Sequence, residues 1–90
     1  MNPVIDIIVP VYRGLEETRR CVQSVVDNPQ QSAYQLVIIN DASPEPEIYP
    51  FLQEFAARYE HVSLLENEHN LGFVATVNRG MSLNPTHDVI

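Results

Sequence analysis

The sequence predicts an α/β fold built around a mostly parallel β-sheet, and two observations carry this prediction. Short runs that are rich in β-branched residues and apolar on both faces recur along the chain, as is typical of buried parallel strands. Between them lie stretches in which apolar residues return every three or four positions, the spacing of an amphipathic helix. The resulting order β-α-β-α-β-α-β implies parallel strands joined by right-handed helical crossovers.

The first strand–helix unit occupies residues 5–28. The run IDIIVPVY, residues 5–12, is the expected strand. The helix expected over residues 15–28 has Glu16 and Glu17 in its first turn, where the helix dipole favours acidic side chains. It ends at Asn28-Pro29. Its apolar face consists of Leu15, Thr18, Val22, Val25 and Val26.

The second unit begins with the strand YQLVIIND, residues 34–41. Ser43 is the expected N-cap of the following helix and Pro44 its first residue, with Glu45 and Glu47 in solvent at the helix start. The helix itself is predicted by an unbroken i, i+3, i+4 spacing of Ile48, Phe51, Leu52, Phe55, Ala56 and Tyr59.

The third unit is the strand HVSLLEN, residues 61–67, and a helix over residues 70–83 that is entered through Gly72 and ends near Asn84-Pro85. HDVI, residues 87–90, begins a fourth strand at the end of the chain. We therefore interpret residues 1–90 as a single partial domain, truncated within a larger one. A truncated parallel sheet has an uncovered edge, and this edge suggests a homodimer.

Composition limits the classes of function. The chain has 5 Lys and Arg residues against 12 Asp and Glu residues, and this balance argues against nucleic-acid binding. No apolar run approaches the roughly 20 residues of a membrane helix, and the N-terminus lacks the pattern of a signal peptide. The only cysteine, Cys21, is expected to be a small core residue and cannot form an internal disulfide. The sequence therefore favours a cytoplasmic protein.

Candidate binding residues follow the strand ends, where open parallel sheets bind their ligands. The first strand turns into its helix through PVYRG, which has too few glycines for a dinucleotide-binding loop, and the chain has no lysine for a P-loop. The three histidines lack the spacing of a metal site, and no Ser or Cys lies in a nucleophile elbow. What remains is an aromatic ring, Tyr12, and a carboxylate, Asp41, at adjacent strand ends.

A nucleobase would use this pair, because its flat face stacks on an aromatic ring and its polar edge needs hydrogen bonds. The imide N–H of uracil or thymine is a suitable donor to a carboxylate. On spacing alone, Tyr12 fits packing at the rim of the sheet equally well. On general residue frequencies, Asp41 in NDAS is better explained as a turn-forming residue than as a base-binding one.

Three motifs, IIVPVYRG, VIINDASP and NLGFVATVNRGM, together resemble the N-terminal part of the family 2 glycosyltransferases, which have the GT-A fold. The family pattern runs strand-P-x-Y-N, strand-D-D-G/A-S and N-x-G-x-x-x-A-x-N-x-G. The resemblance covers nearly the whole chain and implies a three-layer α/β/α Rossmann-like fold, of which this chain is the nucleotide-recognition portion. Arg13 replaces the usual Asn and Asn40 the first acid, so the identity of the base stays open.

The resemblance also implies roles for individual residues. Tyr12 would lie against the base of a nucleotide sugar, and Pro10 and Val11 would shape that wall. Asp41 would bind the base, usually uracil or thymine. Three residues that match the third motif would lie near the nucleotide and the sugar: Asn70, Gly72 and Asn78.

By this resemblance, the parent protein transfers a sugar from a UDP- or dTDP-sugar to an acceptor hydroxyl with inversion. Mg²⁺ or Mn²⁺ is expected for the parent enzyme, with its D-x-D ligands outside this chain, so we expect neither a metal site nor a catalytic residue here. The alternative is a stand-alone, non-catalytic nucleotide-binding or interaction module. A phosphate-accepting receiver domain would need an acidic pair after the first strand, where the sequence has Pro-Val-Tyr.

Overall fold

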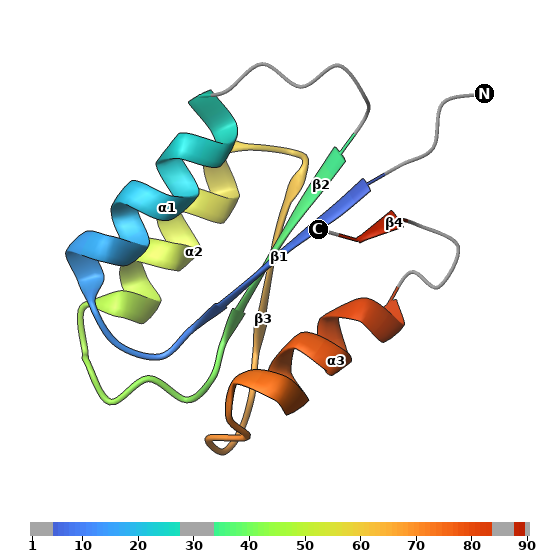
Figure 1. The fold of residues 1–90 in the computed structure, drawn as a ribbon. Helices are drawn as coiled ribbons and strands as arrows, with labels where there is room; N and C mark the ends of the chain where they lie inside the picture. The colour runs from blue at the N-terminus through green and yellow to red at the C-terminus, as the bar shows by residue number, and fades with distance from the viewer. Residues whose placement is uncertain (1–4, 28–33, 84–87, 90) are drawn as a thin grey trace.

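The computed structural model describes residues 5–27, 34–83 and 88–89. Within them the order of elements is β1 (Ile5–Val11), α1 (Leu15–Asp27), β2 (Tyr34–Asn40), α2 (Ile48–Arg58), β3 (Val62–Glu66), α3 (Phe73–Leu83) and β4 (Asp88–Val89). The strands are all parallel and lie in the order β3-β2-β1-β4 (Figure 1). The predicted α/β alternation is confirmed. The expected helix ends at Asn28-Pro29 and Asn84-Pro85, and residues 87 and 90 of the expected fourth strand, lie outside the described residues.

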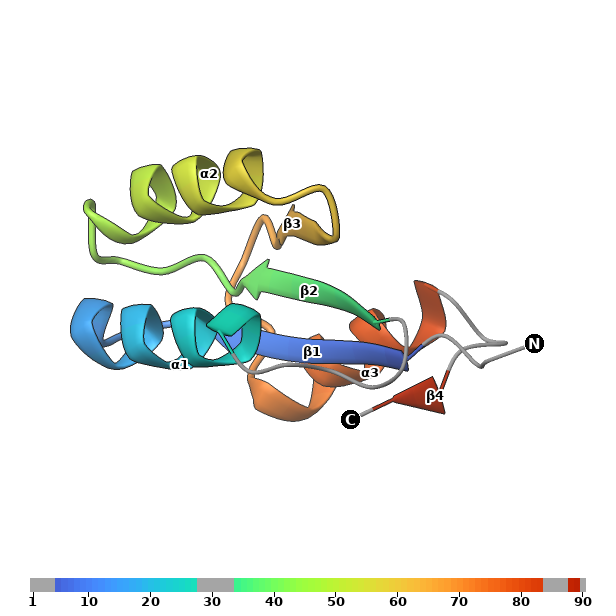
Figure 2. The ribbon, with the colours of Figure 1, turned by 90° about the horizontal axis from the view of Figure 1, so that it is seen from above.

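Helices cover both faces of the sheet, with α1 and α2 on one face and α3 on the other (Figure 2). The strand order explains this arrangement. The chain moves from β1 to β2 to β3 in one direction and returns past β1 to β4 in the other, so right-handed crossovers place α3 opposite the first two helices. The longest described helix, α1, has 13 residues. None of the described helices has both the length and the apolar character that a bilayer crossing requires.

The main core fills the space between the sheet and the helices α1 and α2. Its buried members are Val11, Val22, Leu36, Ile38, Ile48, Leu52, Phe55 and Val62, each at most 6% exposed. The apolar residues whose spacing predicted the second helix therefore belong to this core or pack against it, as expected. Burial of one such aliphatic or aromatic side chain contributes about 1.5–3 kcal/mol.

The start of α2 differs from the sequence-based expectation. The helix begins at Ile48, and the Ser43 hydroxyl instead accepts a hydrogen bond from the Glu45 N–H at 3.2 Å, within a turn. Pro46 disfavours helical dihedrals at the residue before it, which delays the helix. Glu45 is not a solvated side chain either, because both of its carboxylate oxygens accept the Gly14 N–H, at 3.1 and 3.2 Å.

The expectation of a buried Cys21 is wrong, because its side chain is exposed. The neighbouring Val22 is fully buried against the sheet. Consecutive residues on an α-helix point about 100° apart, since a turn takes 3.6 residues, and here this rotation carries Cys21 off the face that packs against the sheet.

The sheet has an incompletely paired strand at the β4 side. β4 pairs only with Ile5 and Asp6 of β1. Among the described residues, positions 7–11 of β1 therefore have a partner strand on the β2 side alone. The expected homodimer through this edge stays a prediction.

Gly80 allows α3 to lie close to the sheet. A Cβ atom at this position would lie 2.7 Å from Cγ2 and 2.8 Å from Cδ1 of Ile8, and 3.1 Å from Cδ1 of Ile39. Carbon atoms in favourable contact are about 3.5–4.0 Å apart. The close approach of helix and strands thus depends on the missing side chain.

We predict that Gly80→Ala lowers the free energy of unfolding by about 1–2 kcal/mol. Overpacking costs about 1–3 kcal/mol, and the better helix propensity of Ala offsets up to about 1 kcal/mol of that. Urea unfolding checks this. In an Ile8→Val background, which removes Cδ1, the cost should be smaller. A Gly80→Ala protein as stable as the wild type would contradict the account.

Candidate functional site

The candidate site lies at the carboxyl ends of β1 and β2. Val11 and Asn40 are partners in the parallel ladder, so the residues that follow them lie side by side. The Asp41 N–H donates a hydrogen bond to the Val11 carbonyl at 2.8 Å, which fixes the two strand ends together. A hollow of about 100 Å³ opens here, lined by Pro10, Val11, Tyr12, Asp41 and Phe73. Four of the predicted site residues therefore meet in one place, and Phe73 joins them from the start of α3.

Tyr12 is not a core residue. Its side chain lies at the rim of the sheet and is 37% exposed. The guanidinium carbon of the neighbouring Arg13 lies 5.2 Å from the centre of its ring, a cation–π distance. The ring therefore forms a wall of the hollow while an adjacent cation contacts it.

Asp41 is nearly buried, at 4% exposed, and its carboxylate holds the start of α3. Oδ1 accepts hydrogen bonds from the Leu71 N–H at 2.7 Å and from Asn67 Nδ2 at 2.9 Å, and Oδ2 accepts one from the Gly72 N–H at 2.9 Å. The first N–H groups of a helix and the loop before it have no carbonyl partners within the helix. Asp41 supplies the missing acceptors from a different strand.

These hydrogen bonds also determine the charge of the site. Burial of the Asp41 carboxyl by itself would raise its pKa, but the Leu71 and Gly72 N–H groups and the Asn67 and Thr76 side chains outweigh burial and hold the pKa below its usual value. Asp41 is therefore an anion at neutral pH, although it is surrounded by protein.

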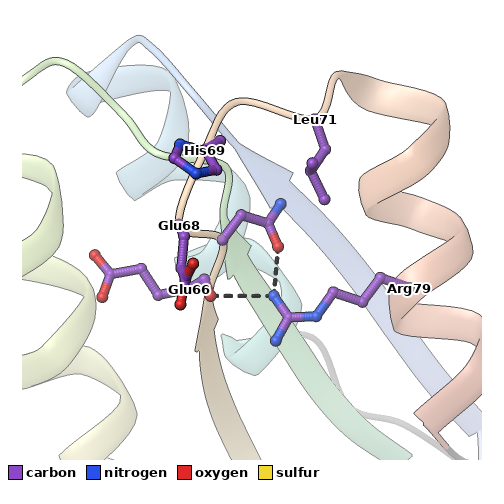
Figure 3. A pocket seen from close by; sticks show the side chains of 6 residues that line it. Glu66, Glu68, His69, Leu71 and Arg79 are labelled. Carbon is purple, nitrogen blue, oxygen red and sulfur yellow. Dashed lines mark hydrogen bonds between the residues drawn. The ribbon is translucent and has the colours of Figure 1, made fainter.

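Asn67 and Thr76 are site residues that the sequence analysis missed. They are 5% and 0% exposed. Asn67 Nδ2 donates to Thr76 Oγ1 at 3.0 Å as well as to Asp41, while Asn67 Oδ1 accepts a hydrogen bond from Arg79 Nη1 (Figure 3). Thr76 occupies the position at which the family pattern has Ala. Its hydroxyl group was the feature of the sequence that could have indicated a polar role at this position.

The third-motif residues occupy different surroundings. Gly72 adopts φ +87°, and nothing lies within 4 Å of the place where a Cβ would be. Asn70 Nδ2 makes a long hydrogen bond of 3.5 Å to the Asp41 carbonyl. Asn78 lies exposed on α3 and lines neither hollow described here, so its role near the sugar stays a prediction.

A second, more open hollow of about 380 Å³ lies between the end of β3 and α3 (Figure 3). It is lined by Glu66, Asn67, Glu68, His69, Leu71 and Arg79. Arg79 Nη1 also donates to the Glu66 carbonyl at 3.1 Å, which joins the helix to the strand end. Within the described ranges no three His, Cys, Asp or Glu side chains gather closely enough to hold a metal ion.

We predict that Asp41→Asn lowers the free energy of unfolding by about 2–3 kcal/mol at neutral pH, because the new amide nitrogen would face a buried N–H donor. The folded-state pKa of Asp41 lies below the unfolded value of about 3.9. The stabilisation by the carboxylate is therefore complete above about pH 4 and is lost as the pH falls through the folded-state pKa. Urea unfolding across this range should show the gap between wild type and variant closing in acid.

Glu60→Gln is the matched control for this prediction, because Glu60 is an exposed carboxylate and its removal should leave stability nearly unchanged at every pH. A gap between wild type and Asp41→Asn that stays constant into acid would contradict the role given to the charge.

Gly72→Ala tests whether glycine is needed here for its positive φ and not for lack of space around it. We expect a loss of about 1–2 kcal/mol in unfolding free energy, because a Cβ disfavours positive φ even where nothing crowds it. Gly72→Asn should cost less, since Asn tolerates this conformation better. Equal thermal-unfolding losses for both variants would show that something other than φ makes glycine necessary.

The chain is similar to known glycosyltransferases. The model of the family described as "Glycosyl transferase family 2" matches residues 6–84. An uncharacterized glycosyltransferase of Haemophilus influenzae is 23% identical over 79 residues, which are 88% of this chain and 24% of that protein. A dolichyl-phosphate beta-glucosyltransferase, ALG5D, of Trichomonas vaginalis is 26% identical over 83 residues, or 84% of this chain and 25% of that protein. The chain thus spans about a quarter of the length of these relatives.

A solved structure shares the fold. The mannosyltransferase PcManGT from Pyrobaculum calidifontis, in complex with GDP-Man and Mn²⁺, superposes with a TM-score of 0.74 at 17% identity over 91% of this chain and 24% of that one. The likeness confirms the expected three-layer, Rossmann-like GT-A fold. Because the family match extends over residues 6–84, with the three motifs inside it, this chain belongs to glycosyl transferase family 2.

Proposed function

We propose that this chain is the nucleotide-recognising part of a glycosyltransferase that moves a sugar from a nucleotide-diphosphate sugar to an acceptor hydroxyl with inversion. The observation that carries the proposal is the hollow in which Tyr12 and Asp41 meet at the carboxyl ends of β1 and β2. Membership of the family supports sugar transfer. The GDP-Man complex of the mannosyltransferase supports a nucleotide sugar as the class of donor.

In this proposal the base stacks on Tyr12 between the walls formed by Pro10 and Val11, and its polar edge faces Asp41. The Asp41 carboxylate already accepts hydrogen bonds from the Leu71 and Gly72 N–H groups and from Asn67. A carboxylate has about four lone-pair sites, so it can also accept the imide N–H of uracil or thymine. A UDP- or dTDP-sugar is the donor that matches this edge.

The reaction itself is a displacement at the anomeric carbon. The acceptor oxygen forms a bond to that carbon, the bond to the diphosphate oxygen breaks with its electron pair, and a base takes the hydroxyl proton. We place that base and the Mg²⁺ or Mn²⁺ site in other parts of the parent protein. The residues described here bind and orient the donor, so this chain alone should transfer no sugar. A cytoplasmic location and self-association through the sheet edge are further parts of the proposal.

Tyr12→Ala tests the stacking role. We expect it to weaken binding of UDP or dTDP by about 1–3 kcal/mol, the usual effect of losing one base–aromatic contact, whereas Tyr12→Phe should bind nearly as well as the wild type. Calorimetric titration gives the dissociation constants. Tyr49→Ala is the matched control, because Tyr49 on α2 is 36% exposed, almost the same as Tyr12. An unchanged dissociation constant for Tyr12→Ala would remove the ring from the site.

A further inference from the structure

Phe73 is an unusual residue on the surface of this molecule. It is the first residue of α3 and is 71% exposed. Phe51 and Phe55 on α2 and Tyr59 just after it, by contrast, contact one another, with the ring centres of Phe51 and Phe55 5.9 Å apart and those of Phe55 and Tyr59 5.1 Å apart. Single exposed apolar residues are ordinary on protein surfaces. Phe73 differs because it lines the same hollow as Tyr12 and Asp41.

The position of Phe73 is fixed relative to Tyr12 by a short chain of hydrogen bonds. The two residues just before it, Leu71 and Gly72, donate their N–H groups to the Asp41 carboxylate. Asp41 in turn donates its own N–H to Val11, the residue before Tyr12. The backbone at Phe73 is therefore anchored to the strand end that carries Tyr12, and a ligand that uses both rings meets a preorganised site.

The chemistry of the hollow selects a flat ligand. Two aromatic rings come from two different elements, and a buried carboxylate lies with them in the same hollow. Gly72, whose N–H is bonded to Asp41, carries no side chain, and the space where its Cβ would lie is open. A planar ring with a hydrogen-bonding edge fits such a site, because its faces can stack and its edge can meet the polar group.

We propose that Phe73 is a second stacking residue, so that the base of a nucleotide lies between the rings of Tyr12 and Phe73. The inference rests on the proposed function, since it concerns the base of the nucleotide sugar. It extends that function by assigning base binding to α3 as well as to the strand ends.

The test compares five substitutions by calorimetric titration of the 90-residue chain with UDP, dTDP, GDP and ADP, after circular dichroism has shown that each variant is folded. Phe73→Ala should raise the dissociation constant of the preferred nucleotide about 5- to 150-fold, the range for loss of one base–aromatic contact. Phe73→Tyr should bind like the wild type. Phe73→Leu should bind as weakly as Phe73→Ala, because leucine keeps apolar bulk without a flat face.

Val74→Ala is the matched control. Val74 is the next residue on α3, is 70% exposed and does not line the hollow, so its removal should leave the dissociation constant unchanged. An equal loss in Val74→Ala and Phe73→Ala would assign the effect to the helix start and overturn the stacking role.

The remaining outcomes separate the inference from the function on which it rests. If Tyr12→Ala weakens binding and Phe73→Ala does not, the second stacking wall is wrong and the nucleotide site stands. If Phe73→Leu binds like the wild type, the ring covers the base without stacking, and the inference is again wrong. If the folded wild-type chain binds none of the four nucleotides, the proposed function fails as well. If Phe73→Ala leaves nucleotide binding unchanged but abolishes a dimer in sedimentation, the ring serves a second copy of the chain.

Discussion

The carboxylate of Asp41 is the interaction on which the arrangement of the site depends. Asp41 follows the last residue of β2, and its backbone N–H donates a hydrogen bond to the Val11 carbonyl at the end of β1. Its carboxylate accepts hydrogen bonds from Asn67, which follows β3, and from the loop before α3. Through its backbone N–H and its buried carboxylate, this one residue therefore joins the ends of β1, β2 and β3 to the helix on the opposite face from α1 and α2. Hydrogen bonds to a charged group are stronger than those between neutral groups, and leaving their partners unsatisfied in a buried site is costly. The hollow has its shape because these partners converge on Asp41.

The motifs that identify the family serve several different physical tasks. Gly80 permits close packing of α3 on the sheet, and Gly72 permits a backbone conformation with positive φ. Tyr12 forms a wall of the hollow. Asn40, which replaces the first acid of the pattern, is 3% exposed, and its Oδ1 accepts the Ser43 N–H at 3.0 Å. An amide oxygen can accept this hydrogen bond as a carboxylate oxygen can, so the replacement preserves the turn before α2.

The periodic part of the fold could be predicted from the sequence, because strand and helix spacing are local properties. The meeting of Tyr12 and Asp41 was also predictable, since adjacent parallel strands end at the same edge of a sheet. The contacts that Asn67 makes with Asp41 and Glu45 with Gly14 were not predictable, because they depend on how loop side chains are oriented, which the spacing of strands and helices does not determine. The expected cap at Ser43 was wrong, because the general preference of serine for helix starts is weaker here than the restriction that Pro46 imposes.

The most direct test of the nucleotide site is an NMR titration of the 90-residue chain with UDP, dTDP, GDP and ADP, each with and without Mg²⁺. The account predicts that UDP or dTDP shifts the signals of Tyr12, Asp41 and the Gly72 amide, and that Mg²⁺ adds little, since the described residues hold no cluster of metal ligands. A folded sample in which no nucleotide moves these signals would contradict it.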